Sequence, residues 1–185
     1  EPTSLAVLPE VKLSGGTAEV TTTAQPRYEL VRELGEGAVG SVELVYDRDI
    51  SRQVARKRLK ATIQTPSNLA RFIEEIQAVG ALEHPGIAPI HDVGVDEHGY
   101  FFTMKYVQGE TLETILDALR ENNPQYLSKY SLDARVGMFE QILRTMNFAH
   151  AQGVVHRDIK PANIIVGKYG EVLMMDWGVA KRVGT

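Results

Sequence analysis

A short segment of the chain brings together three side chains that could act on a phosphoryl group. It reads His156-Arg157-Asp158-Ile159-Lys160-Pro161-Ala162-Asn163. An aspartate can accept a hydrogen bond from a substrate hydroxyl, a nearby lysine can neutralise a transferring phosphoryl group, and an asparagine oxygen can bind magnesium. Asp158, Lys160 and Asn163 are therefore candidates for these three roles. Each could singly be a cap or turn residue, and it is the ordered set that favours the chemistry.

A second acidic candidate lies eighteen residues after Asp158, in the sequence Asp176-Trp177-Gly178. It follows the strand-like run of residues 172–175. A carboxylate is a hard oxygen ligand of the kind that magnesium prefers. Asp176 would therefore complete a magnesium site with Asn163.

A lysine and a glutamate further upstream form another candidate pair. In the run Val54-Ala55-Arg56-Lys57, strand alternation places Lys57 on the same face as Ala55. A solvated surface lysine is the alternative, but a lysine that binds phosphate needs a carboxylate to fix its position. On the following predicted helix, Glu75 lies at the border of the apolar face and Glu74 lies further toward solvent. We therefore favour Glu75 as the partner of Lys57.

A glycine-rich segment, Gly35-Glu36-Gly37-Ala38-Val39-Gly40, precedes this strand. Alone it is also compatible with an ordinary hairpin. A dinucleotide-binding loop should open a helix, whereas residues 41–46 alternate as a strand, which favours a hairpin that covers nucleotide phosphates. Glycines let backbone N–H groups approach a phosphate without an intervening side chain. Val42 would then lie against the adenine.

The hydrophobic pattern predicts the elements that must hold these side chains. It predicts strands over residues 28–34, 41–46, 53–59, 88–95 and 100–106. A helix with Ser67 as its cap should end near Gly80, and further helices are predicted over residues 112–119 and 132–149. The chain thus has a strand-rich first half and a helix-rich second half, without internal repeats.

The long predicted helix carries many apolar side chains, and these must be covered by another surface. They are Leu132, Val136, Phe139, Ile142, Leu143, Met146 and Ala149. Leaving such residues in water forgoes roughly 1.5–3 kcal/mol each. We therefore expect either further protein over this face or self-association through it.

Composition excludes several classes of function. The 185 residues are 43% hydrophobic with a formal net charge of -4, so no basic field supports nucleic-acid binding. No cysteine is present to form a disulfide or a thiolate metal site, which fits a reducing compartment. No apolar run reaches the roughly 18 residues of a membrane span, and no signal peptide is recognisable. We expect a cytoplasmic location, and leave open a membrane anchor outside this chain.

Together these motifs resemble the protein kinase superfamily, and closely the Hanks-type bacterial serine/threonine kinases. The resemblance begins at about Tyr28 and implies an α+β fold with an antiparallel-sheet N-lobe, one regulatory helix and a helical C-lobe. It also implies ATP and Mg²⁺ as cofactors and protein substrates with serine or threonine acceptors. By resemblance, the backbone of Gly35, Glu36, Gly37 and Gly40 would cover the nucleotide phosphates, and Lys57 would form the activating ion pair with Glu75. The resemblance also implies that Asp158 is the catalytic base. Asn163 and Asp176 would bind the metal.

The resemblance further assigns an adenine pocket and a regulatory stack. Met104 would lie at the back of the adenine pocket, and the hinge would consist of Lys105, Tyr106 and Val107. The pocket would be lined by Val42, Ala55 and Ile165. The stacked residues of an active kinase would be Val79, Ile90, His156 and Trp177. Lys160 marks the serine/threonine type.

Three features depart from the family pattern. Arg56 replaces an apolar residue, but its side chain should point away from Lys57 and have little consequence. Trp177 stands where phenylalanine is usual, which would alter how readily the metal loop flips. The sequence ends at Thr185, before the Ala-Pro-Glu motif and later helices of a kinase. We therefore expect an incomplete catalytic domain with little activity toward peptides.

The predicted organisation is a flexible tail over residues 1–26, a kinase N-lobe over 27–107 and a partial C-lobe over 108–185. The leading functional hypothesis is transfer of the ATP γ-phosphate to protein hydroxyl groups. The main alternative is an inactive nucleotide-binding or scaffolding module. A small-molecule kinase is less favoured because His156-Arg157-Asp158 with Lys160 is the protein-kinase form. An open reading frame that continues past Thr185 would favour the enzyme.

Overall fold

The computed structural model describes residues 10–14, 17–21, 26–37, 40–60 and 65–182. Its compact part divides into two units. The first unit contains a five-stranded sheet, and the second contains the helices α1 to α4 with several short strands. The predicted α+β, kinase-like class is confirmed by this content.

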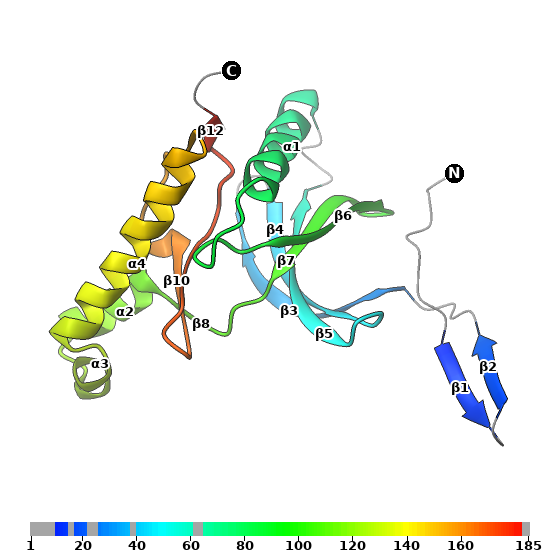
Figure 1. The fold of residues 1–185 in the computed structure, drawn as a ribbon, viewed down its shortest axis with the longest axis horizontal. Coiled ribbons are helices and arrows are strands. Elements are labelled where there is room, and N and C mark those ends of the chain that lie inside the picture. Colours follow the sequence, from blue (N-terminus) through cyan, green and yellow to red (C-terminus); the bar gives the residue numbers. More distant parts are fainter. Residues whose placement is uncertain (1–9, 15–16, 22–25, 38–39, 61–64, 183–185) are drawn as a thin grey trace. The chain divides into compact units, whose positions relative to one another are not determined.

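The sheet of the first unit is antiparallel between the pairs whose register is defined, and its strand order is β3-β4-β5-β7-β6 (Figure 1). The strands are β3 (Tyr28–Glu36), β4 (Gly40–Asp47), β5 (Arg52–Leu59), β6 (Ile90–Asp96) and β7 (Gly99–Lys105). Each lies within a few residues of a strand predicted from the alternation of apolar residues. Burial is concentrated in β4, β5 and β7, whereas β3 buries only Tyr28 and β6 has no fully buried residue.

A small aromatic core fills one face of this sheet, and polar groups join its outer strands. Tyr28, Val45, Val54 and Phe101 form the buried cluster. The Tyr28 hydroxyl, at the start of β3, donates to Asp92 on β6 at 2.9 Å. Because β3 and β6 are the two outer strands, this bond draws the sheet edges together.

The first strand is less regular than its sequence predicts. Its register with β4 shifts between Leu30 and Arg32 and again between Glu33 and Gly35. Each shift interrupts the simple two-residue alternation. Leu30 precedes both shifts and pairs in register with Val45, and it is exposed although Tyr28 on the same face is buried.

Helix α1 (Pro66–Gly80) begins earlier than predicted. Its N-cap is Thr65, whose side chain accepts a hydrogen bond from the Asn68 N–H, and not Ser67. Pro66 occupies the first turn, where its fixed φ and missing N–H are tolerated. The residue before a proline avoids helical dihedral angles, so Thr65 is a natural end point.

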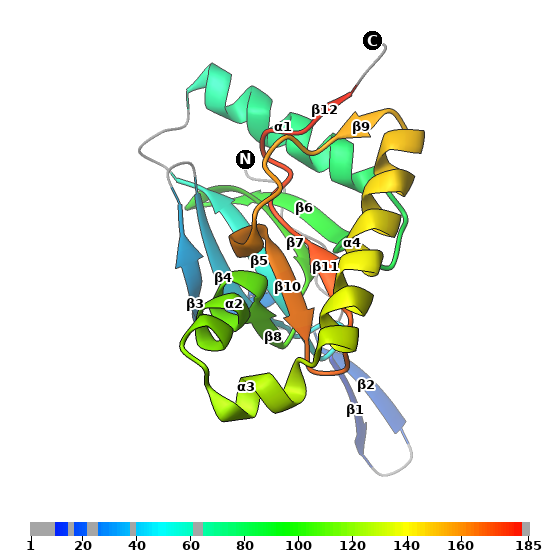
Figure 2. The same ribbon diagram turned by 90° about the vertical axis from the view of Figure 1, so that its left-hand side faces the viewer.

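The second unit contains the remaining elements. Its other helices are α2 (Leu112–Arg120), α3 (Pro124–Lys129) and α4 (Leu132–Ala151), with the short helical turn η2 (Pro161–Asn163). Its strands are β8 (Gly109–Thr111), β9 (Val154–Val155), β10 (Ile164–Gly167), β11 (Val172–Met174) and β12 (Lys181–Arg182). They form the sheets β11-β10-β8 and β12-β9, and α4 runs beside β9 and β11 (Figure 2).

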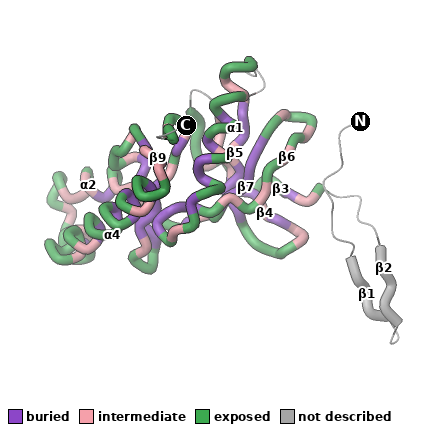
Figure 3. The backbone as a smooth tube through the Cα atoms, turned by 45° about the horizontal axis from the view of Figure 1, so that its top comes forward, coloured by how far each residue is buried: buried purple, intermediate pink, exposed green. Residues whose placement is uncertain are grey.

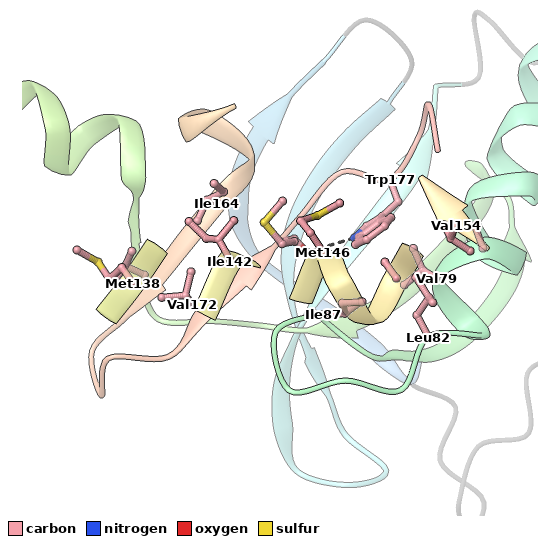
Figure 4. Packing of buried hydrophobic residues seen from close by; sticks show 14 of the residues in the cluster. Val79, Leu82, Ile87, Met138, Ile142, Met146, Val154, Ile164, Val172 and Trp177 are labelled. Atoms are coloured by element: carbon pink, nitrogen blue, oxygen red, sulfur yellow. Dashed lines mark hydrogen bonds between the residues drawn. The ribbon is translucent and has the colours of Figure 1, made fainter. Parts of the chain in front are cut away.

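The core of the second unit joins α1 and α4 to the strands. Val79 and Leu82 from the end of α1 pack in one buried cluster with Met146 of α4 and with Trp177 (Figure 4). Ile87 belongs to the same cluster. This packing groups residues 65–90 with the second unit, whereas the sequence analysis assigned them to the N-lobe. Sequence order alone does not reveal that difference, because the contacts join residues far apart in the chain.

Two short strands lie within the segment that we expected to be a structureless tail. They are β1 (Glu10–Ser14) and β2 (Thr17–Thr21), which pair antiparallel with Glu10 opposite Thr21. Their sequences, EVKLS and TAEVT, do alternate between polar and apolar residues, but each run is only five residues long and shows no sustained periodicity. The remainder of the predicted tail before Pro26 lies outside the described residues.

Helix α4 carries two apolar stripes, and only one is covered within the described residues. The buried stripe contains Met138, Ile142, Thr145, Met146 and Ala149. The other, which we call the exposed stripe, consists of Leu132, Val136, Phe139 and Leu143, with exposed fractions of 51–66%. Figure 3 shows exposed and buried stretches alternating along this helix. In the described part of the chain, no helix is long and apolar enough to cross a membrane.

Candidate functional site

Asp158, Lys160 and Asn163 are joined by direct hydrogen bonds. Lys160 Nζ lies 2.8 Å from Asp158 Oδ2, and Asn163 Nδ2 donates to the same oxygen at 2.9 Å. Asn163 Nδ2 also donates to the Asp158 carbonyl oxygen at 3.0 Å. The turn η2 makes this possible by folding Asn163 back toward the aspartate. The three residues picked out by their spacing are thus brought together.

These contacts fix the charge states of the pair. The Lys160 ammonium lowers the pKa of Asp158, with a further contribution from the Asn163 amide, while partial desolvation acts in the opposite direction. In return, Asp158 raises the pKa of Lys160. Asp158 is therefore a carboxylate and Lys160 an ammonium at neutral pH. The site holds a permanent hydrogen-bond acceptor beside a permanent positive charge.

His156 anchors this loop from inside the core. Its ring is fully buried. Nε2 lies 3.0 Å from the Met175 carbonyl oxygen, which can only accept, and Nδ1 accepts the N–H of Asp158 at 3.3 Å. The two bonds require the neutral tautomer with its proton on Nε2. His156 thus ties the backbone of Asp158 to the strand that leads to Asp176.

Trp177 packs against His156 and completes the buried anchor. The two ring centroids are 4.5 Å apart, and the indole Nε1–H donates to the Met174 carbonyl oxygen at 3.3 Å. Of the four residues expected to stack, Val79 and Trp177 are buried in the main cluster and Ile90 packs against it. His156 joins them through its contact with Trp177. The four residues therefore belong to one packed region, with the direct ring contact between His156 and Trp177.

The donor set at Asn163 and Asp176 fits a hard divalent cation. Because Asn163 Nδ2 is directed to Asp158, its Oδ1 is the amide atom that could bind a metal. Asp176 supplies a carboxylate and has φ of 56°, a left-handed conformation that is costly for a non-glycine residue. Such strain at the end of β11 is typical of functional positions. Among the described residues no group of three or more acidic, histidine or cysteine side chains forms a metal site, so the fit depends on this asparagine–aspartate pair.

Glu75 and Glu74 have opposite environments on α1. Glu75 is 6% exposed, whereas Glu74 is exposed. A Cβ atom added to Gly178 would lie 3.3 Å from Glu75 Oε2, so the carboxylate reaches the glycine of the Asp176-Trp177-Gly178 loop. The choice of Glu75 over Glu74 agrees with this burial. Gly178 is a residue whose proximity the sequence did not indicate.

The glycine-rich segment forms a tight reversal between β3 and β4. The Gly37 N–H donates to the Gly40 carbonyl oxygen at 2.8 Å, while residues 38 and 39 lie outside the described residues. A Cβ on Gly40 would lie only 2.4 Å from the Arg58 carbonyl oxygen. The absence of a side chain therefore lets the loop rest directly on β5. Glu36, in the same loop, forms an ion pair of 2.7 Å with Lys60, which lowers the pKa of Glu36.

Lys57 lies in the middle of β5, with fixed neighbours on both sides. Its Cα partners are Val42 on β4 and Phe102 on β7. Ala55 faces Leu44 and Met104 in the same way. The predicted nucleotide residues Val42, Ala55, Lys57 and Met104 are therefore grouped in adjacent strands of one sheet.

The predicted hinge begins where β7 ends. Lys105 is exposed and Tyr106 is half-buried, and the Tyr106 hydroxyl accepts a hydrogen bond of 3.3 Å from Arg32 on β3. Val107 is buried in the second unit with Ala88 and Leu173, and Ile165 packs against that cluster. Val107 and Ile165 are thus neighbours, as expected for residues that line one pocket.

Comparison with known proteins agrees with this geometry. A family model described as "Protein kinase domain" matches residues 28–185. This chain belongs to the protein kinase family. The kinase resemblance that the motifs suggested is confirmed, and the matched region begins at Tyr28, where the sequence pattern changes.

Similar curated kinases come from chlamydiae. Serine/threonine-protein kinase PknD of Protochlamydia amoebophila is 39% identical over 159 residues, which are 83% of this chain and 16% of that protein. The kinase of the same name from Chlamydia trachomatis serovar L2b is 36% identical over 158 residues, 83% of this chain and 17% of its own length. The kinase of that name from Chlamydia pneumoniae is 34% identical over 162 residues, which are 85% of this chain and 17% of that protein. The chain thus spans about a sixth of the length of these kinases.

Two charged residues of this kinase domain were not recognised from sequence. We expected Arg56 to have little consequence, but it and Arg58 are buried and hydrogen-bonded to carboxylates on other strands. Their importance could not be predicted because the partners, Glu43 and Asp96, lie on strands distant in sequence. The available signal was a run of three consecutive charged residues, Arg56-Lys57-Arg58, inside a predicted strand.

Proposed function

We propose that this chain forms the nucleotide-binding and catalytic part of a serine/threonine protein kinase. The reaction is transfer of the γ-phosphoryl group of ATP to a protein hydroxyl group. In it, the bond between the γ-phosphorus and the bridging oxygen breaks, a bond to the acceptor oxygen forms, and ADP leaves. The observation that carries the proposal is the hydrogen-bonded set of Asp158, Lys160 and Asn163.

Asp158 is suited to act on the acceptor hydroxyl. Its depressed pKa keeps it ionised at neutral pH, so it can accept a hydrogen bond from the hydroxyl and take up the proton as the new bond forms. Lys160 places a positive charge beside that carboxylate at 2.8 Å. Such a charge can stabilise the phosphoryl oxygens during transfer.

The nucleotide would be bound by residues of the first unit. The backbone around Gly35, Gly37 and Gly40 is open to phosphate because it lacks side chains. Lys57 would contact the phosphates, with Glu75 as the carboxylate that holds it. Ala55 and Met104 would contact the adenine, with Lys105 and Tyr106 as the hinge.

We assign the metal-binding role to Asn163 and Asp176, and the metal to Mg²⁺. Protein kinases use ATP with a divalent cation, and the two oxygen ligands here match the preference of magnesium. When bound, the ion would neutralise phosphate charge. Asn163 also fixes the orientation of Asp158, so one residue links the metal site to the proposed base. A reaction that consumes ATP is expected in the cytoplasm.

Substitution of Asp158 by asparagine in the full-length protein tests the proposal. We expect phosphoryl transfer to fall roughly 10²- to 10⁴-fold, because a proton acceptor is removed. Affinity for ATP with Mg²⁺, measured by calorimetry, should stay within a few-fold because Asp158 acts on the acceptor. An inactive nucleotide-binding module would instead show ATP binding and no transfer in the unmodified protein. Unchanged turnover in Asp158→Asn would refute Asp158 as the base.

We further propose that the exposed stripe of α4 mediates contact between copies when these 185 residues are isolated. Its four apolar side chains are spaced by four, three and four residues, the spacing of a helix–helix seam. Arg135 and Glu140 flank the stripe and are five residues apart, so they could pair between two parallel helices. Both charge and shape therefore suit a second copy of the same helix.

A further inference from the structure

Arg56 and Arg58 flank Lys57 in sequence, and both are unusually buried for arginine. Their exposed fractions are 8% and 7%. Because side chains alternate along a strand, both lie on the face of β5 opposite Lys57. A buried guanidinium is strongly destabilising unless a carboxylate pairs with it. The partners of these arginines therefore decide how β5 is held.

Two carboxylates from different strands provide that pairing. Arg56 Nε donates to Glu43 Oε2 on β4 at 2.8 Å, and Arg58 Nε lies 3.8 Å from the same oxygen. Arg58 also makes two parallel hydrogen bonds to Asp96, at the end of β6, the Nη2–Oδ2 bond being 2.8 Å long. Fork-like pairs of this kind fix direction as well as distance. We call Glu43, Arg56, Arg58 and Asp96 the ionic layer.

Burial and hydrogen bonding at Asp96 show how tightly the layer is held. Burial alone would raise the pKa of Asp96, but the hydrogen bonds from Arg58 and from the His98 N–H lower it overall. The carboxylate is thus charged at neutral pH.

The ionic layer rests on an aromatic ring that extends it to a fourth strand. The guanidinium carbons of Arg56 and Arg58 lie 5.6 and 5.5 Å from the centroid of Phe101 on β7. A Cβ on Gly94 would lie 2.8 Å from Phe101 Cζ, so the backbone of β6 closes over the ring. Strands β4, β5, β6 and β7 are therefore clamped together at this level of the sheet.

The same segment of β5 carries functional groups on its other sides. Lys57 lies between the two arginines, and the carbonyl oxygen of Arg58 is the atom on which Gly40 rests. A change in the local twist of β5 at this level would therefore move the lysine and the end of the glycine loop together.

We propose that the ionic layer positions Lys57 and Gly40 for nucleotide binding by fixing the local twist of β5 between β4 and β7. Arg56 and Arg58 are then positioning residues that act through the strand and touch no nucleotide. The inference rests on the role proposed above for Lys57. The proposal predicts that removing charges from the ionic layer raises the KM for ATP even when the stability of the fold is restored.

The decisive experiment separates stability from positioning in the full-length protein. Arg56→Met alone removes the 2.8 Å hydrogen bond to Glu43 and leaves this half-buried carboxylate only the 3.8 Å contact with Arg58, so it should lower both the melting temperature and the productive use of ATP. Glu43→Met combined with Arg56→Met replaces the pair by apolar side chains of similar size, which should restore the melting temperature. We expect the double variant to keep a KM for ATP raised roughly tenfold, because small misplacements of binding groups are costly. A double variant with the melting temperature and KM of the unmodified protein would overturn the proposal.

Two further variants keep the test decisive. Arg58→Lys retains the charge but loses the two-bond fork, so it should fold and still raise the KM for ATP, and an unchanged KM would count against the layer. Arg52→Met, at the exposed start of β5, is the matched control and should change neither quantity. Lys57→Met tests the underlying role. If Lys57→Met turns over ATP normally, the proposed role of Lys57 is wrong. If Lys57→Met is inactive but the Glu43→Met/Arg56→Met double variant behaves like the unmodified protein, only the proposal about the ionic layer is wrong.

Discussion

Lys160 and Asp158 form a 2.8 Å ion pair across a single intervening residue, on the exposed surface of the catalytic loop. The extended backbone of Lys160, with φ of -151° and ψ of 157°, allows the long side chain to turn back toward the aspartate. One contact thus does two things. It keeps the proposed base ionised, and it holds a positive charge where phosphoryl oxygens would need one.

The ion pair predicts a specific pH dependence. Because Lys160 lowers the pKa of Asp158, the carboxylate stays ionised as the pH falls toward the ordinary range of an aspartate. Lys160→Met removes the main cause of this lowering, so the pKa of Asp158 should rise. The acidic limb of the kcat/KM profile should then move to higher pH, in addition to a lower plateau.

The profile of Lys160→Arg provides the control. Arginine keeps a positive hydrogen-bond donor, so its acidic limb should remain near that of the unmodified protein. Profiles of phosphoryl transfer between pH 4 and 8 would be compared at saturating ATP, a range that begins near the usual aspartate pKa and ends about four units above it. Identical limbs in all three proteins would mean that Lys160 does not control the ionisation of the base.

The two neighbouring glutamates of α1 allow a closely matched comparison. Glu75→Gln and Glu74→Gln make the same chemical change one residue apart, but only Glu75 is buried and lies beside Gly178. We expect Glu75→Gln to lower kcat/KM roughly 10- to 100-fold by misplacing phosphate-binding groups. Glu74→Gln should be close to normal. Equal effects in a peptide phosphorylation assay would show that burial on this helix does not mark the functional carboxylate.

Much of this fold could be predicted because its signals are local. The spacing of Phe72 and Val79 predicted α1, and both are buried as expected. The start of the helix was misplaced because Ser67 resembles a cap, while the actual cap, Thr65, is specified by Pro66 after it. The catalytic loop was the most predictable part of the site, since its three candidate residues, Asp158, Lys160 and Asn163, lie close together in the sequence.

The features that could not be predicted depend on pairs distant in sequence. Arg56 and Glu43 become partners only when β4 and β5 align, and Arg58 finds Asp96 only when the chain returns in β6. On α4, Ile142 and Phe139 are equally apolar, but only Ile142 is covered. Periodicity reports that a face is apolar and does not report which element, if any, packs on it.

Trp177 makes a hydrogen bond that the phenylalanine usual at this position could not make. Trp177→Phe removes the Nε1–H donor to the Met174 carbonyl and part of the packing against His156. We expect a loss of about 0.5–1.5 kcal/mol from the hydrogen bond, with a further loss from packing. This should lower the melting temperature by several degrees, measured by circular dichroism. Tyr169→Phe, at a position 84% exposed, is the control and should melt normally. A normal melting temperature for Trp177→Phe would mean that the indole bond adds no stability.

Gly40 should tolerate a side chain less well than Gly35. A Cβ on Gly40 would meet the Arg58 carbonyl oxygen at 2.4 Å, whereas a Cβ on Gly35 would have nothing within 4 Å. Gly40→Ala therefore forces the backbones of β4 and β5 apart, at a cost of about 1–3 kcal/mol. Gly35→Ala should cost clearly less in the free energy of unfolding, measured with denaturant. If both substitutions cost the same, the close approach of Gly40 to β5 is not what requires glycine there.

The exposed stripe of α4 predicts how a sample of these 185 residues alone should behave in solution. Its four apolar side chains are 51–66% exposed. Burying each of them against another surface would stabilise the association by up to roughly 1.5–3 kcal/mol. We therefore expect the average mass from light scattering to rise with protein concentration. Val136→Glu with Phe139→Lys places charges in the centre of the stripe and should leave a monomer. Arg144→Gln changes the charge at an exposed position on another side of the same helix, and this variant should still associate. A sample whose mass is confirmed by mass spectrometry, and which stays monomeric at all concentrations, would contradict the assignment of this stripe as a contact surface.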